Sequence, residues 1–198
     1  MKYLYATAAI AASLVAAPAF AADISGARIE GIVGYDSPKV SGLEKEIQEF
    51  GIDVDADLDG ILYGVGIGYD FAVGNNISLG VDAEYSDSSS DFNLKNGDEL
   101  VTISFARDLY VGSRITTAVS DSFNLYGKLG YTNARASVGY YDGDEGFGII
   151  DNIDGVRAGF GGQFALGGNS YVGLEYRYSN YESDLERHQV AATLGFRF

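Results

Sequence analysis

The sequence predicts an all-β fold, an eight-stranded antiparallel up-and-down transmembrane β-barrel, from three observations. Apolar and polar residues alternate along eight segments, and the connections between these segments are long and short in turn. The composition also favours strands, because 27 Gly and 15 Tyr occur with only two Pro and no Cys. A strand presents successive side chains to opposite faces, so a wall between lipid and a filled interior requires this period of two.

Residues 1–21 are predicted to be a cleavable signal peptide. Lys2 is followed by an apolar run, and Ala19 and Ala21 are the small residues that a signal peptidase requires before its cleavage site. The apolar run is shorter than the roughly 20 residues that a membrane-spanning helix needs. Residues 22–198 are predicted to form one outer-membrane β-barrel domain, and removal of Lys2 changes the formal net charge from −15 to −16.

The first three segments, residues 27–36, 60–72 and 77–87, alternate without interruption. Their apolar faces share aliphatic and tyrosine side chains: Ile29, Val33, Tyr35; Ile61, Tyr63, Val65, Ile67; Leu79, Val81 and Tyr85. Their other faces share charged residues and glycines: Arg28, Glu30; Gly64, Gly66, Gly68, Asp70; Asp82 and Glu84. The glycines either make room for long charged side chains opposite or ease the curvature of the sheet.

The fourth and fifth segments, residues 101–115 and 123–138, alternate with interruptions. In the fourth, Arg107 falls on the apolar face, which a β-bulge or a position at the barrel rim would explain. In the fifth, the apolar residues have changed parity by Ala134, so we expect a bulge near residues 132–134.

The last three segments, residues 154–166, 170–180 and 187–198, alternate again. Their apolar faces share large side chains: Val156, Phe160; Val172, Leu174, Tyr176; Val190, Leu194, Phe196 and Phe198. Most segments supply about the ten residues that a tilted membrane strand needs. A soluble lipocalin-like barrel is the alternative fold, but a soluble barrel does not usually place a continuous aromatic and aliphatic band on every strand.

The connections indicate the orientation in the membrane. Those after the first, third, fifth and seventh segments are long, and those after the second, fourth and sixth are short turns. Because short periplasmic turns and longer outer loops are typical of membrane barrels, both termini are expected in the periplasm. All four long connections have a net negative charge, and together they hold nearly all of the net negative charge of residues 22–198.

Strand parity places twelve charged side chains on the inward face of the barrel. They are Arg28, Glu30, Asp70, Asp82, Glu84, Asp108, Arg114, Lys128, Arg157, Glu175, Arg177 and Arg197. Six cations thus face six carboxylates, and a paired buried network is tolerable where a lone buried charge is very costly. Eight strands enclose an interior wide enough only for side chains, so the sequence predicts a polar plug and no continuous pore.

Residues 107–114, 124–132 and 190–198 resemble the eight-stranded outer-membrane protein β-barrel family, which groups the OmpA-like transmembrane domain, OmpX-like proteins and opacity-like surface proteins. The resemblance implies a place in the bacterial outer membrane, in contact with its lipid and lipopolysaccharide. It also implies that the terminal Phe198 is the insertion signal for the barrel-assembly machinery; the alternative is a plain lipid-facing aromatic.

The residues favour a structural surface protein that presents acidic extracellular loops for surface interaction or adhesion. A narrow porin-like channel and a lipid A-modifying enzyme are the alternatives. The lipid A deacylase type uses a His-x-Ser pair, whereas His188, the only histidine, is followed by Gln189 and Val190. We therefore predict no catalytic, cofactor or metal site, and the acidic loops argue against a nucleic-acid partner.

Overall fold

The computed structural model describes residues 24–40, 59–96, 99–142, 145–182 and 185–198. The predicted signal peptide lies outside these residues. Nine strands are present among them: β1 (Gly26–Val40), β2 (Gly60–Ala72), β3 (Ile77–Ser88), β4 (Asp91–Asn96), β5 (Glu99–Ser120), β6 (Phe123–Asp142), β7 (Glu145–Gly167), β8 (Ser170–Tyr181) and β9 (Leu185–Arg197).

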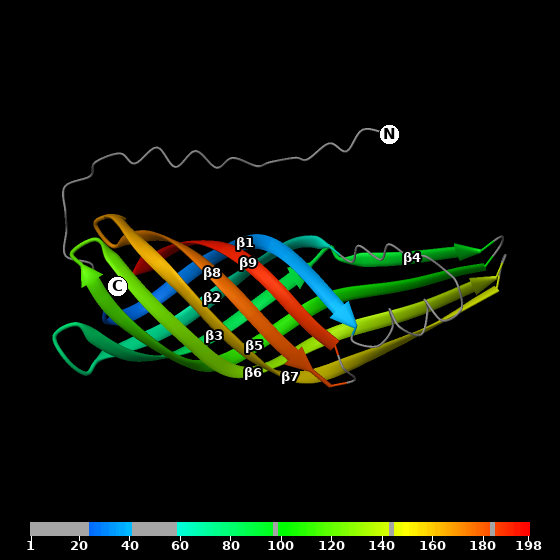
Figure 1. Cartoon of the computed structure of the whole chain (residues 1–198), viewed down its shortest axis with the longest axis horizontal. Coiled ribbons are helices and arrows are strands. Elements are labelled where there is room, and N and C mark those ends of the chain that lie inside the picture. The colour runs from blue at the N-terminus through cyan, green and yellow to red at the C-terminus, as the bar shows by residue number, and fades with distance from the viewer. Residues whose placement is uncertain (1–23, 41–58, 97–98, 143–144, 183–184) are drawn as a thin grey trace.

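The strands form one closed antiparallel ring (Figure 1). Neighbours in the ring follow the order β3-β2-β1-β9-β8-β7-β6-β5, and the pairing of β3 with β5 closes it. β4 follows β3 after a two-residue break and pairs with β5 beyond it, so β3 and β4 occupy one position in the ring. The ring therefore has eight positions, which confirms the predicted fold class.

The two ends of the barrel differ. One end, called here the turn end, holds the start of β1, the end of β9 and the short connections at residues 73–76, 121–122 and 168–169. The other end, called the loop end, holds the remaining connections. Both described chain termini thus lie at the end with the short turns, as the alternation of connections predicted.

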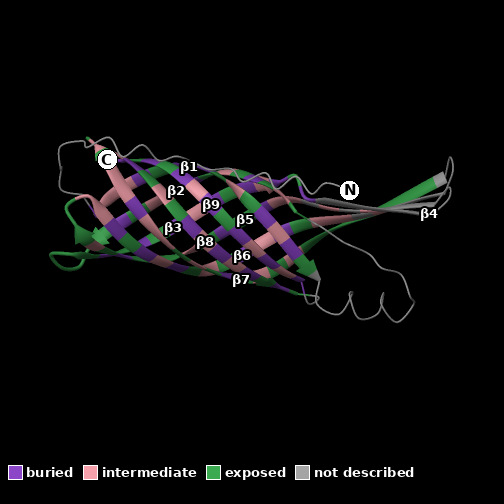
Figure 2. Ribbon diagram, turned by 45° about the horizontal axis from the view of Figure 1, so that its top comes forward, coloured by how far each residue is buried: buried purple, intermediate pink, exposed green. Residues whose placement is uncertain are grey.

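Buried and exposed residues alternate along the strands, as the chequered ribbon in Figure 2 shows. The outward face is an apolar band in which tyrosines lie toward the loop end, namely Tyr35, Tyr63, Tyr85 and Tyr131. Toward the turn end the band is richer in phenylalanine, namely Phe71, Phe196 and Phe198. Aromatic girdles of this kind mark the two membrane–water interfaces of transmembrane barrels.

Two connections predicted to be long loops are instead β-hairpins. β4, β5, β6 and β7 continue past the loop end of the ring as a four-stranded sheet, called here the protruding sheet (Figure 1). Only two residues separate β4 from β5, and only two separate β6 from β7. These extensions were predicted as loops because glycines and acidic residues interrupt the alternation in them, whereas backbone pairing alone can extend a hairpin.

The strand phase also differs from expectation at one place. The register shifts between Phe105 and Asp108 of β5, so a bulge lies beside Arg107, which shares the outward parity of Leu109 and stands where β5 leaves its pairing with β3. The bulge expected in β6 near residues 132–134 lies in the facing strand instead, because the shift opposite Ala134 and Ala136 adds its extra residue to β5, and β6 pairs with β7 without a shift. Ala134 keeps the inward phase and packs against Tyr181, so the change of parity reflects an apolar patch inside the barrel.

Candidate functional site: the charged lumen

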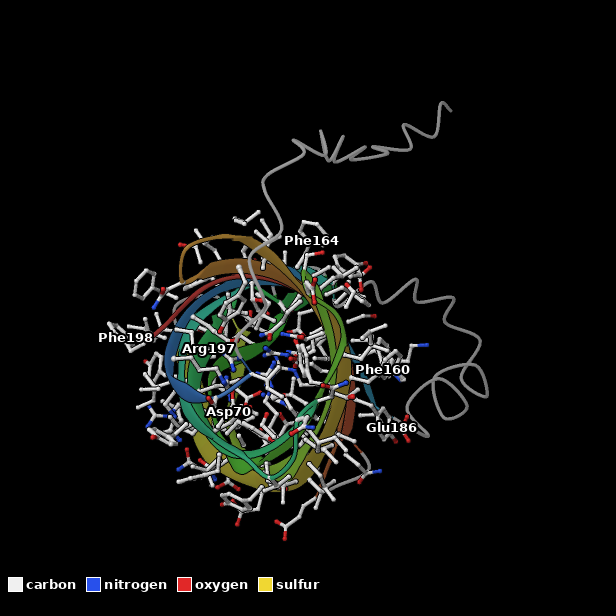
Figure 3. The ribbon with its side chains drawn as sticks, turned by 90° about the vertical axis from the view of Figure 1, so that its left-hand side faces the viewer. Asp70, Phe160, Phe164, Glu186, Arg197 and Phe198 are labelled. Carbon is white, nitrogen blue, oxygen red and sulfur yellow. The ribbon has the colours of Figure 1, made fainter. Side chains whose placement is uncertain are left out.

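The interior of the barrel, the lumen, receives all twelve charged side chains that strand parity assigned to it. None of them is more than 5% exposed. In the end-on view of Figure 3, Asp70 and Arg197 point into the ring, whereas Phe160 and Phe198 point away from it. Ion pairs join these charges into one network, described here as three groups along the barrel.

The group nearest the turn end is built around Arg28. Its Nε atom lies 2.9 Å from Oδ2 of Asp70, and its Nη1 atom lies 3.3 Å from Oε2 of Glu30. Its Nη2 atom also donates to Asp82. Arg197, at the end of β9, also belongs to this group, because its Nη2 atom lies 3.1 Å from Oδ2 of Asp70.

Gly68 explains how Arg28 fits into so narrow an interior. A Cβ atom at Gly68 would lie 2.7 Å from Cζ of Arg28 and 2.8 Å from Oδ1 of Asp82. Both distances are shorter than van der Waals contact, so the absence of a side chain at this position is what admits the guanidinium. Of the two reasons proposed for the inward glycines of β2, room for a long charged side chain therefore applies at Gly68.

The middle group contains two carboxylates and shares its cations between them. Lys128 donates to Glu84, and its Nζ atom lies 3.3 Å from Oε1 of Glu175. Arg177 also bridges the pair, with Nε 2.5 Å from Glu175 Oε1 and Nη1 3.0 Å from Glu84 Oε2. Tyr126 adds an uncharged donor, because its hydroxyl donates a hydrogen bond to Glu175 Oε2 at 2.7 Å.

An arginine stacked on an aromatic ring links the middle group to the turn-end group. The guanidinium carbon of Arg114 lies 3.6 Å from the ring centroid of Tyr126. Its Nη1 atom is 3.6 Å from Oε1 of Glu30, which belongs to the turn-end group. A cation over an aromatic face is stabilised most when it is desolvated, as Arg114 is here.

The group nearest the loop end includes two charges that sequence reasoning left out. Arg157 and Arg187 both contact Asp108, Arg187 with its Nη1 atom 3.2 Å from Oδ2. Arg187 also pairs with Asp36, which accepts a further hydrogen bond of 3.0 Å from Nε2 of Gln189. Asp36 and Arg187 lie at the outer ends of the predicted first and last segments and were left out of the lumen, although both share the inward parity of their neighbours.

With these two residues, the charge of the described lumen is balanced. Seven cations (Arg28, Arg114, Lys128, Arg157, Arg177, Arg187 and Arg197) lie among seven carboxylates (Glu30, Asp36, Asp70, Asp82, Glu84, Asp108 and Glu175). Each cation is within ion-pair distance of at least one carboxylate. Such a network can hold strands together and fill space, and it offers no excess charge to select a permeating ion.

His188 lies outside the lumen. It faces outward on β9, where its Nδ1 atom is 2.7 Å from the hydroxyl of Tyr176 and its ring centroid is 5.2 Å from that of Tyr178. Ser37 is its partner in the register with β1, but no hydrogen bond between these two side chains occurs in the part of the chain that is described. His188 is thus part of an aromatic cluster on the outer wall.

Phe198, the predicted assembly signal, also lies on the outer wall. Its side chain is 71% exposed, and its ring stands edge-on to Phe196 with centroids 5.0 Å apart. Its backbone N–H donates to the carbonyl oxygen of Ala27 at 2.8 Å, so the terminal residue is held to the first strand. Phe198 is therefore fixed at the turn end with its ring toward lipid (Figure 3).

The described residues include no cluster of three or more His, Cys, Asp or Glu side chains arranged to hold a metal ion. Nor do they contain a helix with the length and apolar character needed to cross a membrane. Of the aspartates that alternate before Gly60, Asp53, Asp55 and Asp57 lie outside the described residues.

Comparisons with known proteins agree with this geometry. The family model of the outer membrane protein beta-barrel domain matches residues 7–198. No curated protein sequence matches the chain. Ail, the attachment invasion locus protein of Yersinia pestis, has a similar structure, with a TM-score of 0.57, 15% identity, and coverage of 88% of this chain and 99% of Ail.

Two more solved structures are similar. Neisserial surface protein A, NspA, gives a TM-score of 0.59 at 14% identity and covers 88% of this chain and 98% of its own. Ail of Yersinia pestis in complex with the heparin analogue sucrose octasulfate gives a TM-score of 0.55 at 17% identity, with coverage of 87% of this chain and 99% of Ail. At these identities the likeness establishes the fold alone.

Proposed function

This chain belongs to the outer membrane protein beta-barrel domain family and lies in the bacterial outer membrane, and on that premise we propose that it is a structural surface protein. Its lumen is a polar plug, and its loop end presents acidic residues to the outside of the cell for surface interaction or adhesion. Residues 1–21 serve as the export signal, and Phe198 serves as the signal for the barrel-assembly machinery.

The balanced ion-pair network is the observation that supports the plug. A conducting pore needs a continuous polar path, whereas the lumen side chains of Arg114, Arg157 and Arg177 are nearly inaccessible to solvent. Moving one of these guanidinium groups aside would separate it from its carboxylates at a large cost in free energy. The network thus favours a closed, rigid barrel over the alternative, a narrow porin-like channel.

Single-channel recording on the reconstituted barrel tests the plug. We expect no steady conductance for the unmodified protein. A double variant that removes one opposed pair, Asp108→Ala with Arg157→Ala, is the matched comparison, because it opens space where the lumen approaches the loop end. Steady conductance by the unmodified protein would establish the channel and refute the plug.

The protruding sheet supports a role in surface contact. It projects beyond the barrel with its two outer strands paired on one side only, since β4 pairs with β5 and the part of β7 before Gly155 pairs with β6. Apolar side chains stand exposed on it, namely Phe147, Ile149 and Ile150. Acidic residues accompany them, among them the exposed Asp151 on β7, so a cationic protein surface is the complementary partner.

Binding of charged probes to the purified barrel tests this surface. Ail has been solved with sucrose octasulfate, but the acidic loops here predict no binding of that polyanion and salt-sensitive binding of oligolysine, both measured by calorimetry. Asp151→Asn should weaken oligolysine binding, whereas Asp121→Asn, which removes one charge at the turn end, should not. Equal binding by both variants would show that the loop end is not the site.

We propose no enzymatic activity. His188 has Tyr176 as its hydrogen-bond partner, and the serine that a lipid A deacylase places two residues after its histidine is Val190 here. Comparison of lipid A by mass spectrometry from cells with and without the gene tests this, with identical lipid A as the expected result.

A further inference from the structure

We propose that the outer wall of the barrel holds a specific binding site for one phosphorylated acyl lipid of the outer leaflet, with Arg107 binding the phosphate and a groove beside it binding an acyl chain. The lipid class is the phosphorylated, multiply acylated glycolipid of that leaflet. The inference rests on the proposed orientation, with the loop end at the cell surface. It does not depend on the plug or on adhesion.

Arg107 is a cation on the outward face of β5. It shares the outward parity of Leu109 and Val111, and the register shift between Phe105 and Asp108 lies beside it. None of the ion pairs found within the described ranges involves Arg107, whereas every cation of the lumen has a carboxylate partner. The charge of Arg107 is thus held at the surface without being neutralised.

Neutral side chains fix the position of this guanidinium. The Nη2 atom of Arg107 donates to Oδ1 of Asn133 at 2.7 Å and to Oδ1 of Asn152 at 3.0 Å. Asn133 is itself oriented, because its Nδ2 atom donates to Asp154 at 2.6 Å, and the hydroxyl of Tyr131 donates to the same carboxylate oxygen at 2.5 Å. Both hydrogen bonds reach the same oxygen of Asp154, which itself stays exposed, and they leave the amide oxygen of Asn133 facing Arg107.

A groove of about 740 Å³ on the outer wall is lined in part by Asn133, the hydrogen-bond partner of Arg107. It runs over β2, β3, β5 and β6, and its lining is almost wholly apolar, including Val65, Ile67, Ala83, Leu109 and Val111. Tyr85 and Tyr131 form its walls, and Asn133, the hydrogen-bond partner of Arg107, lies at its upper edge. Ala83 gives the groove its depth, since the outward residues before and after it on β3, Val81 and Tyr85, are larger.

The arrangement matches a lipid both in its chemistry and in its depth in the membrane. Tyr85 and Tyr131 belong to the loop-end tyrosine girdle, which lies where hydrocarbon meets headgroups. The groove below them therefore faces acyl chains, and Arg107 above them faces headgroups. A guanidinium is the side chain best suited to phosphate, because it offers several donors in one plane and is weakly hydrated.

Native mass spectrometry of the purified barrel in detergent tests the site. The probes are bisphosphorylated lipid A, the same lipid without phosphates, and inorganic phosphate. We expect the unmodified protein to retain one bisphosphorylated lipid in preference to the dephosphorylated one, and millimolar inorganic phosphate not to displace it. Arg107→Gln should raise the dissociation constant at least about ten-fold, the scale of one charge-assisted hydrogen bond.

Three further variants make the result specific. Lys39→Gln removes an exposed cation from β1 and should leave lipid binding unchanged, whereas Arg107→Lys should restore part of it. Ala83→Trp fills the groove and should weaken binding of both acylated probes. Heat-modifiable electrophoretic mobility confirms that each variant is folded. Equal binding by the Arg107→Gln and Lys39→Gln variants, or displacement by inorganic phosphate, would overturn the proposal.

Discussion

Arg28 shows at the scale of single residues how the lumen charges depend on one another. Its guanidinium contacts Asp70, Asp82 and Glu30, which come from three different strands. Removing any one carboxylate leaves two others, but removing the arginine leaves several buried carboxylates facing one another. The stability of the lumen therefore depends more on its cations than on any single acid.

Arg28→Met is expected to lower the free energy of unfolding by about 3–5 kcal/mol, the usual cost of leaving buried charges without their partner. Urea titration in detergent, followed by electrophoretic mobility, measures it. The matched control is Arg135→Met, which removes an exposed arginine outside the lumen and should change the free energy by no more than about 0.5 kcal/mol. Equal effects of the two substitutions would mean that the network does not stabilise the barrel.

At the scale of elements, the barrel wall and the protruding sheet obey different constraints. Strands of the wall have a lipid-facing and a lumen-facing side, so each position is restricted to one class of residue. The part of β7 from Gly146 to Asn152 is exposed on both faces. β6 pairs with β7 without a break from Phe123 to Asp142, so the hairpin continues two strands of the barrel wall. The barrel therefore supports the hairpin and does not depend on it.

Shortening the β6–β7 hairpin is therefore expected to leave the barrel intact. Residues 139–148 are replaced by Asn-Gly, which joins Val138 to its register partner Ile149 through a two-residue turn. The free energy of unfolding should change by less than about 1 kcal/mol, because no ion pair among the described residues involves this segment. Failure of this variant to insert into membranes would show that the extension takes part in folding.

At the scale of the whole molecule, the distribution of polar and apolar side chains is the inverse of that in a water-soluble protein. Its lumen charges are buried and paired, while side chains such as Phe160 and Leu194 stand more than 60% exposed on the outer wall. An apolar surface that encircles the barrel is incompatible with water. Only a lipid or detergent layer can cover it, so the fold and the membrane location have one cause.

Removal of detergent tests this inversion directly. When the folded barrel is exchanged into plain buffer, light scattering is expected to report aggregation, whereas the same protein kept in micelles stays monodisperse. Solubility without detergent would contradict the assignment of the outward face to lipid.

The period of two along each strand is a local property that needs no knowledge of partners, so it was enough to predict the architecture. From this period follow the closed barrel, the lipid-facing band and the burial of residues such as Arg177 and Glu175. Which charges meet, in contrast, is set by the way the strands pair in the folded barrel. Arg187 and Asp36 are 151 residues apart, and their pairing depends on the relative register of β1 and β9. The bulge at Arg107 and the protruding sheet likewise depend on pairing between strands, which no single segment encodes.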